Sequence, residues 1–316
     1  MIRPLYPPIE PYAVHRLTVE APHTLYVEEC GNPRGIPVLF LHGGPGFGCA
    51  EWHRRLFHPG RYRIILFDQR GCGRSRPHGS VEHNNTGALL GDMEVIRRRL
   101  GITHWLLFGG SWGSTLALLY SEACSERVLG LILRGIFLCR RRDLNWLYQE
   151  GASRLFPDYW EQYLAPIPAS ERNDLIGAYH RRLFGESDTE RMEAARAWSL
   201  WEGHTSTLLP STRAEAAFGE PSTALALARI SNHFFVHDTF LEPDQILRHA
   251  GLLNGISGVI VHGRYDVNCP LDNAWALHKA WPGGDLRIIP DAGHSAGETA
   301  TLVALLEATD RFASGF

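Results

Sequence analysis

The stretch WLLFGGSWGSTLALLY, from Trp105 to Tyr120, constrains the fold more than any other part of this 316-residue sequence. It begins with a continuously apolar run that predicts a buried strand, and it ends in an apolar helix. Between them lies a G-x-S-x-G turn centred on Ser111, whose flanking glycines permit a bend where a β-carbon would clash. The turn presents Ser111 at its apex, beside the positive end of the following helix. This pattern predicts a sharp strand-to-helix corner that exposes one serine.

The rest of the chain supplies a sheet into which such a strand fits. Several short β-rich runs are continuously apolar, as expected for strands covered by helices on both faces of a parallel sheet. The eight predicted strands are His15–Glu20, Thr24–Glu29, Val38–Leu41, Arg63–Phe67, Trp105–Phe108, Val128–Leu133, Val259–Val261 and Leu286–Ile289. Helix-like stretches lie at Leu89–Leu100, Ser114–Cys124, Asn273–Trp281 and Glu298–Phe312. We therefore predict an α/β fold with a mostly parallel, eight-stranded sheet and helices on both faces.

The periodicity changes between about residues 139 and 254, where helical segments rich in Trp, Arg and Glu replace the strands. We interpret this segment as an all-helical insertion between the sixth and seventh strands. The prediction divides the chain into a core domain, residues 1–138 and 255–316, and a helical cap domain, residues 139–254. Large rings in such a cap either fill a small helical core or line a substrate cavity. Four tryptophans fall inside the insertion: Trp146, Trp160, Trp198 and Trp201.

Composition argues against several classes of function. The chain has 31 basic and 34 acidic residues, a net charge of −3, and its arginine runs at 97–99 and 140–142 are too short to form a nucleic-acid-binding face. The sequence contains no run of eighteen apolar residues, so we expect no membrane span, and no signal peptide is visible. The six cysteines lie at least 15 positions apart, so no C-x-x-C motif is available for zinc. We expect a cytoplasmic protein with reduced thiols, and the sequence leaves its oligomeric state open.

Two polar residues in the last third of the chain can serve as the base and the acid that the exposed serine needs. A serine hydroxyl is a weak nucleophile near pH 7 and needs a base that is itself oriented by an acid. Asp266 in VIVHGRYDVNCP and His294 in RIIPDAGHSA each follow a predicted strand, where parallel sheets place their sites. Asp291 is a rival acid, but its position suits the start of a turn. We therefore expect Ser111, Asp266 and His294 to form a catalytic triad.

A glycine-rich loop follows the third predicted strand in VLFLHGGPGFG. Glycines in such a loop expose backbone N–H groups toward a developing oxyanion, and the second donor is usually the residue after the nucleophile. Gly44 and Trp112 are the predicted donors, although the choice between the paired glycines stays open. The loop fits neither of the common phosphate-binding glycine motifs, so we do not expect nucleotide binding.

Eight motifs together resemble the prolyl aminopeptidase, or proline iminopeptidase, family of α/β-hydrolase-fold serine peptidases. They are HGGPG, FDQRGCGRSRPH, NNT, GGSWGSTLAL, LRGIF, WSLWEG, VHGRYDVNCP and AGHSA, which span nearly the whole chain. The resemblance implies release of N-terminal proline from short peptides through an acyl-enzyme intermediate, without metal or cofactor. It also implies that Ser111 is the nucleophile, that His294 is the general base and then acid, and that Asp266 orients His294.

An aminopeptidase must recognise a charged terminal nitrogen, for which a carboxylate is the natural partner in a shielded pocket. The resemblance assigns this role to Glu202 in WSLWEG. We predict that Gly203 ends a helix, which places Glu202 in the last turn, against the preference of the helix dipole. Arg134 is expected either to position such carboxylates or to form a structural ion pair. The resemblance assigns three walls of a pyrrolidine pocket: Phe137, Tyr148 and Cys269.

The chain departs from the family pattern in the second cap motif. The family commonly reads A-R-I-E-N-H, whereas this chain has Ser231 in place of the glutamate. If Ser231 faces the pocket, the site lacks one negative charge, and amine binding weakens by about 1 to 3 kcal/mol. Three functions therefore stay open: an aminopeptidase for N-terminal proline, an esterase or arylamidase with relaxed amine recognition, and a catalytically silent binding protein.

Overall fold

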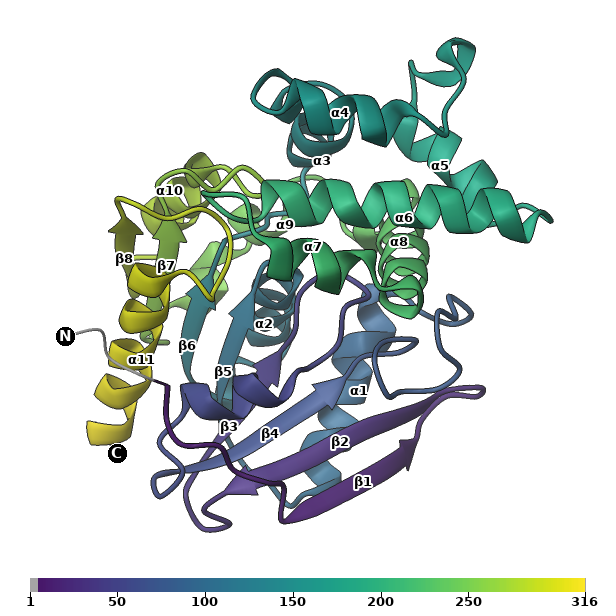
Figure 1. Cartoon of the computed structure of the whole chain (residues 1–316). Helices are drawn as coiled ribbons and strands as arrows, with labels where there is room; N and C mark the ends of the chain where they lie inside the picture. The colour runs from purple at the N-terminus through teal and green to yellow at the C-terminus, as the bar shows by residue number, and fades with distance from the viewer. Residues whose placement is uncertain (1–4, 316) are drawn as a thin grey trace.

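The computed structural model describes residues 5–315 and is built on a single eight-stranded sheet (Figure 1). The strand order is β1-β2-β4-β3-β5-β6-β7-β8, in which β2 runs antiparallel to β1 and β4 and the other neighbours are parallel. All eight predicted strands are present, with each end within two residues of its predicted place, so the prediction of a mostly parallel sheet is confirmed. Their bounds are Ala13–Thr18, Thr24–Gly31, Ile36–Leu41, Tyr62–Asp68, Trp105–Gly110, Val128–Arg134, Gly258–Gly263 and Gly284–Ile289.

The central strands are buried on both faces, which explains their unbroken apolar sequences. Alternate side chains of a strand point to opposite faces of the sheet. In β3, for example, Leu39 and Leu41 join one apolar cluster, whereas Val38 and Phe40 join another on the opposite face. Helices α1, α2 and α10 pack on the first face and α11 on the second. The bounds of these helices are Thr86–Arg99, Trp112–Ala123, Leu271–Ala280 and Thr299–Ser314.

The segment between β6 and β7 contains only helices, as the sequence predicts. Figure 1 shows these helices stacked over one end of the sheet, with α4 and α5 farthest from the strands. Their bounds are α3 Arg141–Tyr148, α4 Pro157–Leu164, α5 Leu175–Leu183, α6 Asp188–Thr205, α7 Thr212–Gly219, α8 Pro221–Val236 and α9 Gln245–Arg248. Short 3₁₀ turns complete the chain: η1 Glu51–Leu56, η2 Ser125–Arg127, η3 Ala152–Arg154, η4 Ala169–Glu171, η5 Asp238–Phe240 and η6 Ala250–Leu253.

The four tryptophans of the inserted helices pack against the apolar core, and none of them lines either of the two cavities at the active site. Trp198 and Trp201 are fully buried, and Trp201 packs edge-on against Trp160 at 5.0 Å between ring centroids. Tyr163 and Tyr179 extend the same cluster, with ring centroids 4.7 Å apart. The sequence left two roles open for these rings, core packing and the lining of a cavity, and the structure shows core packing.

Within residues 5–315, no helix combines the length and hydropathy needed to cross a membrane. The predicted core domain also includes residues 1–4 and 316, which lie outside the described part of the chain.

Candidate active site

Ser111 sits in a strained corner between β5 and α2. Its φ and ψ are 57° and −125°, a conformation that non-glycine residues rarely adopt. The turn closes tightly, because a β-carbon on Gly109 would lie 2.1 Å from the Gly113 carbonyl oxygen, and one on Gly113 would lie 2.0 Å from the Leu41 carbonyl oxygen. The Ser111 N–H donates to the Arg134 carbonyl at 2.9 Å, which ties the corner to β6. The two glycines are thus required to place Ser111 at the carboxyl end of the sheet.

Asp266 and His294 meet at the same end of the sheet. His294 Nδ1 lies 2.7 Å from Asp266 Oδ2, and the other carboxylate oxygen accepts the Cys269 N–H at 2.8 Å. Burial raises the pKa of Asp266, but the charge and hydrogen bond of His294, the charge of His262 and the Cys269 N–H together hold it below its ordinary value. The rival acid, Asp291, is exposed in the turn before His294.

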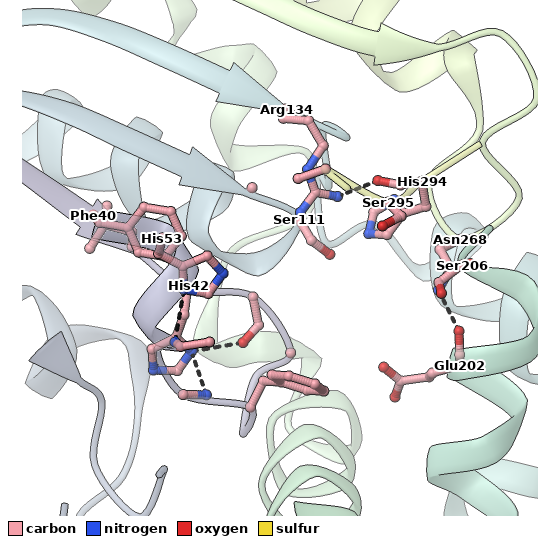
Figure 2. Close-up of a pocket in the computed structure, with 18 of the residues that line it drawn as sticks. Phe40, His42, His53, Ser111, Arg134, Glu202, Ser206, Asn268, His294 and Ser295 are labelled. Carbon is pink, nitrogen blue, oxygen red and sulfur yellow. Dashed lines mark hydrogen bonds between the residues drawn. The ribbon is translucent and has the colours of Figure 1, made fainter. Parts of the chain in front are cut away.

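Ser111 and His294 line one cavity of about 240 Å³. Figure 2 shows the serine side chain beside the imidazole ring. Because Asp266 lies against Nδ1, Nε2 is the ring nitrogen left to accept the serine proton. Two backbone contacts hold His294: Arg134 Nη1 donates to its carbonyl at 2.7 Å, and its N–H donates to the Ser206 carbonyl at 3.1 Å. The position of His294 therefore depends on both the sheet and α6, which ends at the residue before Ser206.

His262 is a further buried group that sequence reasoning missed. Its Nδ1 accepts the Ile136 N–H at 3.1 Å, and its Nε2 lies 2.8 Å from the Cys269 carbonyl. Burial lowers the pKa of His262, which favours the neutral ring that this pair of contacts requires. The residue thus fixes the loop that carries Asp266. Its only sequence signal was its place in VHGRYDVNCP.

The predicted oxyanion donors are Gly44, from the glycine-rich loop, and Trp112, which follows Ser111 in the chain. Gly44 lines the cavity, and Trp112 is the first residue of α2, so its N–H has no acceptor within the helix. Trp112 Nε1 donates to Gln69 Oε1 at 2.9 Å, while the backbone N–H of Gln69 donates to His42 Nε2 at 3.0 Å. Gln69 Nε2 also donates to the His42 carbonyl at 3.0 Å. Gln69, which sequence reasoning missed, therefore connects the serine corner to the glycine loop.

A smaller cavity of about 30 Å³ adjoins Ser111 on the side of the inserted helices. It brings together the residues that the resemblance assigned to a proline pocket, Phe137, Tyr148, Cys269 and Glu202. Burial and the Asp266 charge raise the pKa of the Cys269 thiol well above its ordinary value, although a hydrogen bond with Ser111 opposes this. Several lining residues were not identified from the sequence: Asp143, Leu144, Leu147, Phe235 and Asn268.

Glu202 presents a buried carboxylate to both cavities. Its Oε1 accepts hydrogen bonds from Tyr148 Oη at 2.9 Å and from Trp198 Nε1 at 2.8 Å. Burial raises the pKa of Glu202 to about 7, although these two hydrogen bonds oppose the rise. In residues 5–315 no basic side chain forms an ion pair with this carboxylate. The carboxylate is therefore suited to bind a cation that residues 5–315 do not supply.

The predicted helix end beside Glu202 was two residues too early. Helix α6 continues to Thr205, so Gly203 lies inside it. A β-carbon on Gly203 would lie 2.8 Å from Cγ of Phe218. This glycine therefore serves the close packing of α6 against α7, and Glu202 still falls within the last turn of its helix.

Neither predicted role of Arg134 agrees with its contacts. Arg134 lines the larger cavity and donates to the His294 carbonyl, and within residues 5–315 it forms no ion pair with a carboxylate. It is therefore neither a structural ion-pair partner nor in contact with Glu202.

Ser231 is fully buried on α8 and lines neither cavity. Its hydroxyl donates to the Leu227 carbonyl at 2.7 Å and accepts from Trp198 Nε1 at 2.9 Å. The short side chain of serine can form a hydrogen bond with a carbonyl of its own helix instead of reaching into the pocket. The same indole N–H also donates to Glu202, so Ser231 lies one hydrogen-bonded group away from that carboxylate.

The fold and site define the class of protein. The family model for the alpha/beta hydrolase fold matches residues 36–301. Among solved structures, a putative aryl esterase from Burkholderia cenocepacia superposes with a TM-score of 0.69 at 16% identity, covering 96% of this chain and 100% of that one. The esterase RhEst1 from Rhodococcus sp. ECU1013 gives 0.65 at 18% identity, covering 97% and 98%. These likenesses establish the α/β-hydrolase fold.

Curated relatives narrow this assignment. The proline iminopeptidase of Xylella fastidiosa (strain Temecula1 / ATCC 700964) is 55% identical over 312 residues, covering 98% of this chain and all of the relative. That of Xanthomonas citri is 55% identical, covering 99% of this chain and all of the relative, and that of Arabidopsis thaliana is 48% identical, covering 98% and 82%. The chain therefore belongs to the proline iminopeptidase family of hydrolases.

Proposed function

We propose that this chain is a serine aminopeptidase that releases N-terminal proline from short peptides. The observation that carries the proposal is the buried Glu202 carboxylate, which has no ion-pair partner in the described residues and shares a small cavity with Ser111. A carboxylate placed in this way gains most from a ligand cation, because charge-assisted hydrogen bonds are strong in a shielded site. The terminal nitrogen of proline, one residue from the scissile carbonyl, supplies that cation.

The proposed reaction follows from the contacts of the triad. Ser111 Oγ attacks the carbonyl carbon of the proline residue while His294 Nε2 accepts the hydroxyl proton, and Asp266 holds the imidazole through Nδ1. The carbonyl oxygen becomes an oxyanion that accepts hydrogen bonds from the N–H groups of Gly44 and Trp112. The imidazolium then donates its proton to the leaving nitrogen, and the C–N bond breaks to give an acyl-enzyme. Water, deprotonated by His294, releases proline and restores Ser111.

The residues that line the smaller cavity support proline as the residue removed. Phe137, Tyr148 and Cys269 supply apolar walls for a pyrrolidine ring, and the carboxylate of Glu202 marks the far limit of the pocket. Tyr148 stacks on Trp198 at 4.4 Å between ring centroids, so the wall nearest Glu202 is rigidly packed. A longer peptide on the amino side would collide with this wall, which restricts cleavage to the first residue.

We further propose that residues 139–254 act as a cap domain over the core of residues 1–138 and 255–316. This division is supported by the position of Glu202 on an inserted helix and of Ser111 on the sheet. Short peptides would be its partners, and a cytoplasmic location is consistent with all six cysteines being free.

A second candidate function keeps the same triad but acts on esters or arylamides without strict amine recognition. One observation favours it: Ser231, at the place of a family glutamate, lies outside both cavities and contributes no charge. Glu202 then faces a bound amine without the second carboxylate that the family pattern supplies.

Purified protein assayed on four substrates tests these functions: proline-, alanine- and acetylproline-arylamides and a p-nitrophenyl ester. The aminopeptidase predicts fast cleavage of the free proline substrate and at least tenfold slower cleavage of its acetylated form. Equal rates for the two would refute amine recognition, and cleavage of the ester alone would favour the esterase. Ser111→Ala provides the inactive control. If the protein cleaves none of the substrates and does not react with a fluorophosphonate probe, the result would instead indicate a binding protein.

A further inference from the structure

The two cavities of the candidate active site meet at Ser111 but differ in their access to the triad. Gly44, Ser111, Glu202 and Asn268 line both of them. His294 lines only the larger cavity, whose volume of about 240 Å³ is eight times the 30 Å³ of the smaller one. The site is therefore asymmetric about its nucleophile.

This asymmetry sets the direction in which a peptide lies. In acyl transfer the imidazolium must reach the leaving nitrogen to protonate it. Since His294 faces only the larger cavity, the leaving group must lie there, and the acyl group occupies the smaller cavity. The larger cavity then receives the second residue of the substrate.

The far wall of the larger cavity is apolar and aromatic. Phe40 stacks on His53, with ring centroids 4.3 Å apart (Figure 2). It also stacks on Phe108, with ring centroids 5.4 Å apart. His53 Nδ1 accepts the Ala50 N–H at 2.9 Å, and burial lowers the pKa of His53 to about 3, so this ring is neutral. Further apolar lining residues are Phe47, Trp52, Leu56, Phe218 and Leu227. A flat apolar side chain suits such a wall better than a charged one.

Arg134 also lines the larger cavity and brings a positive charge close to Ser111. A β-carbon added to Gly110, the residue before the serine, would lie 2.4 Å from Nη2 of Arg134. Nη1 donates to the His294 carbonyl, whereas Nε is buried and has no hydrogen-bond partner. In the described part of the chain no carboxylate forms an ion pair with this guanidinium. Asp266 and Glu298 act on this guanidinium through their charges but lie beyond ion-pairing distance, so a ligand carboxylate would be its first directly bonded anion.

We propose that the larger cavity binds the second residue of a dipeptide, with its apolar side chain against the aromatic wall and its terminal carboxylate at Arg134. This inference rests on the proposed function and deepens it by defining the substrate class. A dipeptide with N-terminal proline is a zwitterion whose amine lies at Glu202 and whose carboxylate lies at Arg134, on the two sides of Ser111. The charges of the site match the charges of that substrate in order and in sign.

Steady-state kinetics on the wild-type protein tests the inference directly. We expect kcat/KM for Pro-Phe to exceed that for Pro-Phe-amide by at least tenfold, because the amide lacks the charge that Arg134 would bind. We expect a similar excess over Pro-Gly, which lacks the apolar side chain. Proline arylamide is the reference. If it is cleaved while the three dipeptides react equally, the inference is wrong and the proposed function stands. If none is cleaved, the proposed function itself is wrong.

Two variants separate the contribution of Arg134 from that of the aromatic wall. Arg134→Gln should bring the Pro-Phe to Pro-Phe-amide ratio to about one, and a ratio that stays above ten would overturn the role of Arg134. The ratio is the readout because both substrates depend equally on the bond from Arg134 to His294. Trp52→Ala should lower the preference for Pro-Phe over Pro-Gly severalfold. The matched control is Trp275→Ala, an exposed tryptophan on α10 that lines neither cavity. Equal effects of the two tryptophan variants would contradict the aromatic wall.

Discussion

Replacing Glu202 by glutamine should make the empty protein more stable while making it a poorer enzyme. Burial raises the pKa of this carboxyl from its ordinary 4.5 to about 7. Between these two pH values the folded state keeps a proton that the unfolded state has lost, so stability falls as the pH rises through this window. Once Glu202 is fully ionised above pH 7, the cost reaches about 3 kcal/mol, taking 1.36 kcal/mol for each pKa unit.

Glutamine imitates the protonated carboxyl and carries no such cost at any pH. Its side-chain oxygen can still accept the hydrogen bonds from Tyr148 Oη and Trp198 Nε1. The stability gain of Glu202→Gln over wild type should therefore be less than about 1 kcal/mol at pH 5 and about 3 kcal/mol at pH 8. Urea denaturation followed by tryptophan fluorescence at the two pH values measures the gain. Glu193→Gln, an exposed position on the same helix, is the control, and we expect it to change stability by less than about 0.5 kcal/mol.

The same variant should lose activity toward free-amine substrates. A hydrogen bond to a charged group contributes about 1.5 to 3 kcal/mol, so kcat/KM for proline arylamide should fall by about tenfold to a hundredfold, mainly through KM. Hydrolysis of a p-nitrophenyl ester, which carries no cation, should change by less than threefold. A variant that gains no stability between pH 5 and pH 8 would refute the burial argument. Unchanged peptide kinetics would remove Glu202 from the amine site.

Three further variants test other parts of the site. Ser111→Ala should lower hydrolysis by about 10⁴-fold or more without changing the unfolding midpoint, and residual activity near wild type would reject Ser111 as the nucleophile. Gln69→Leu removes the bridge from Trp112 to the glycine loop, so kcat should drop by about tenfold while KM stays within twofold; a change in KM alone would contradict this positioning role. Trp198→Phe removes a hydrogen bond that lowers the pKa of Glu202, so the acidic limb of kcat/KM for free-amine substrates should move to higher pH. The profile for an ester should not move, and parallel shifts for both substrates would disprove the assignment.

Much of the fold could be predicted from local sequence patterns. The eight strands could be located because strands covered on both faces must be apolar along their whole length, and the G-x-S-x-G corner could be located because few residues tolerate its geometry. The position of Asp266 and His294 after consecutive strands was equally visible, and the structure places the two side chains 2.7 Å apart. Such features depend on a few neighbouring residues and on the general rules of parallel sheets.

Tertiary structure decided the features that depend on residues distant in the chain. Both Arg134 and Glu202 were candidates for an ion pair from the sequence. In the described residues neither lies within ion-pairing distance of an opposite charge, and Arg134 feels Asp266 and Glu298 only from farther away. Ser231 could not be assigned to the pocket or to its surroundings, because that choice depends on the rotation of α8 against α6. The two cavities on either side of Ser111 are formed by loops and helices from the whole length of the chain. The shape of the cavities and the charged groups that face them are set by packing, which is the sum of many weak contacts between distant segments.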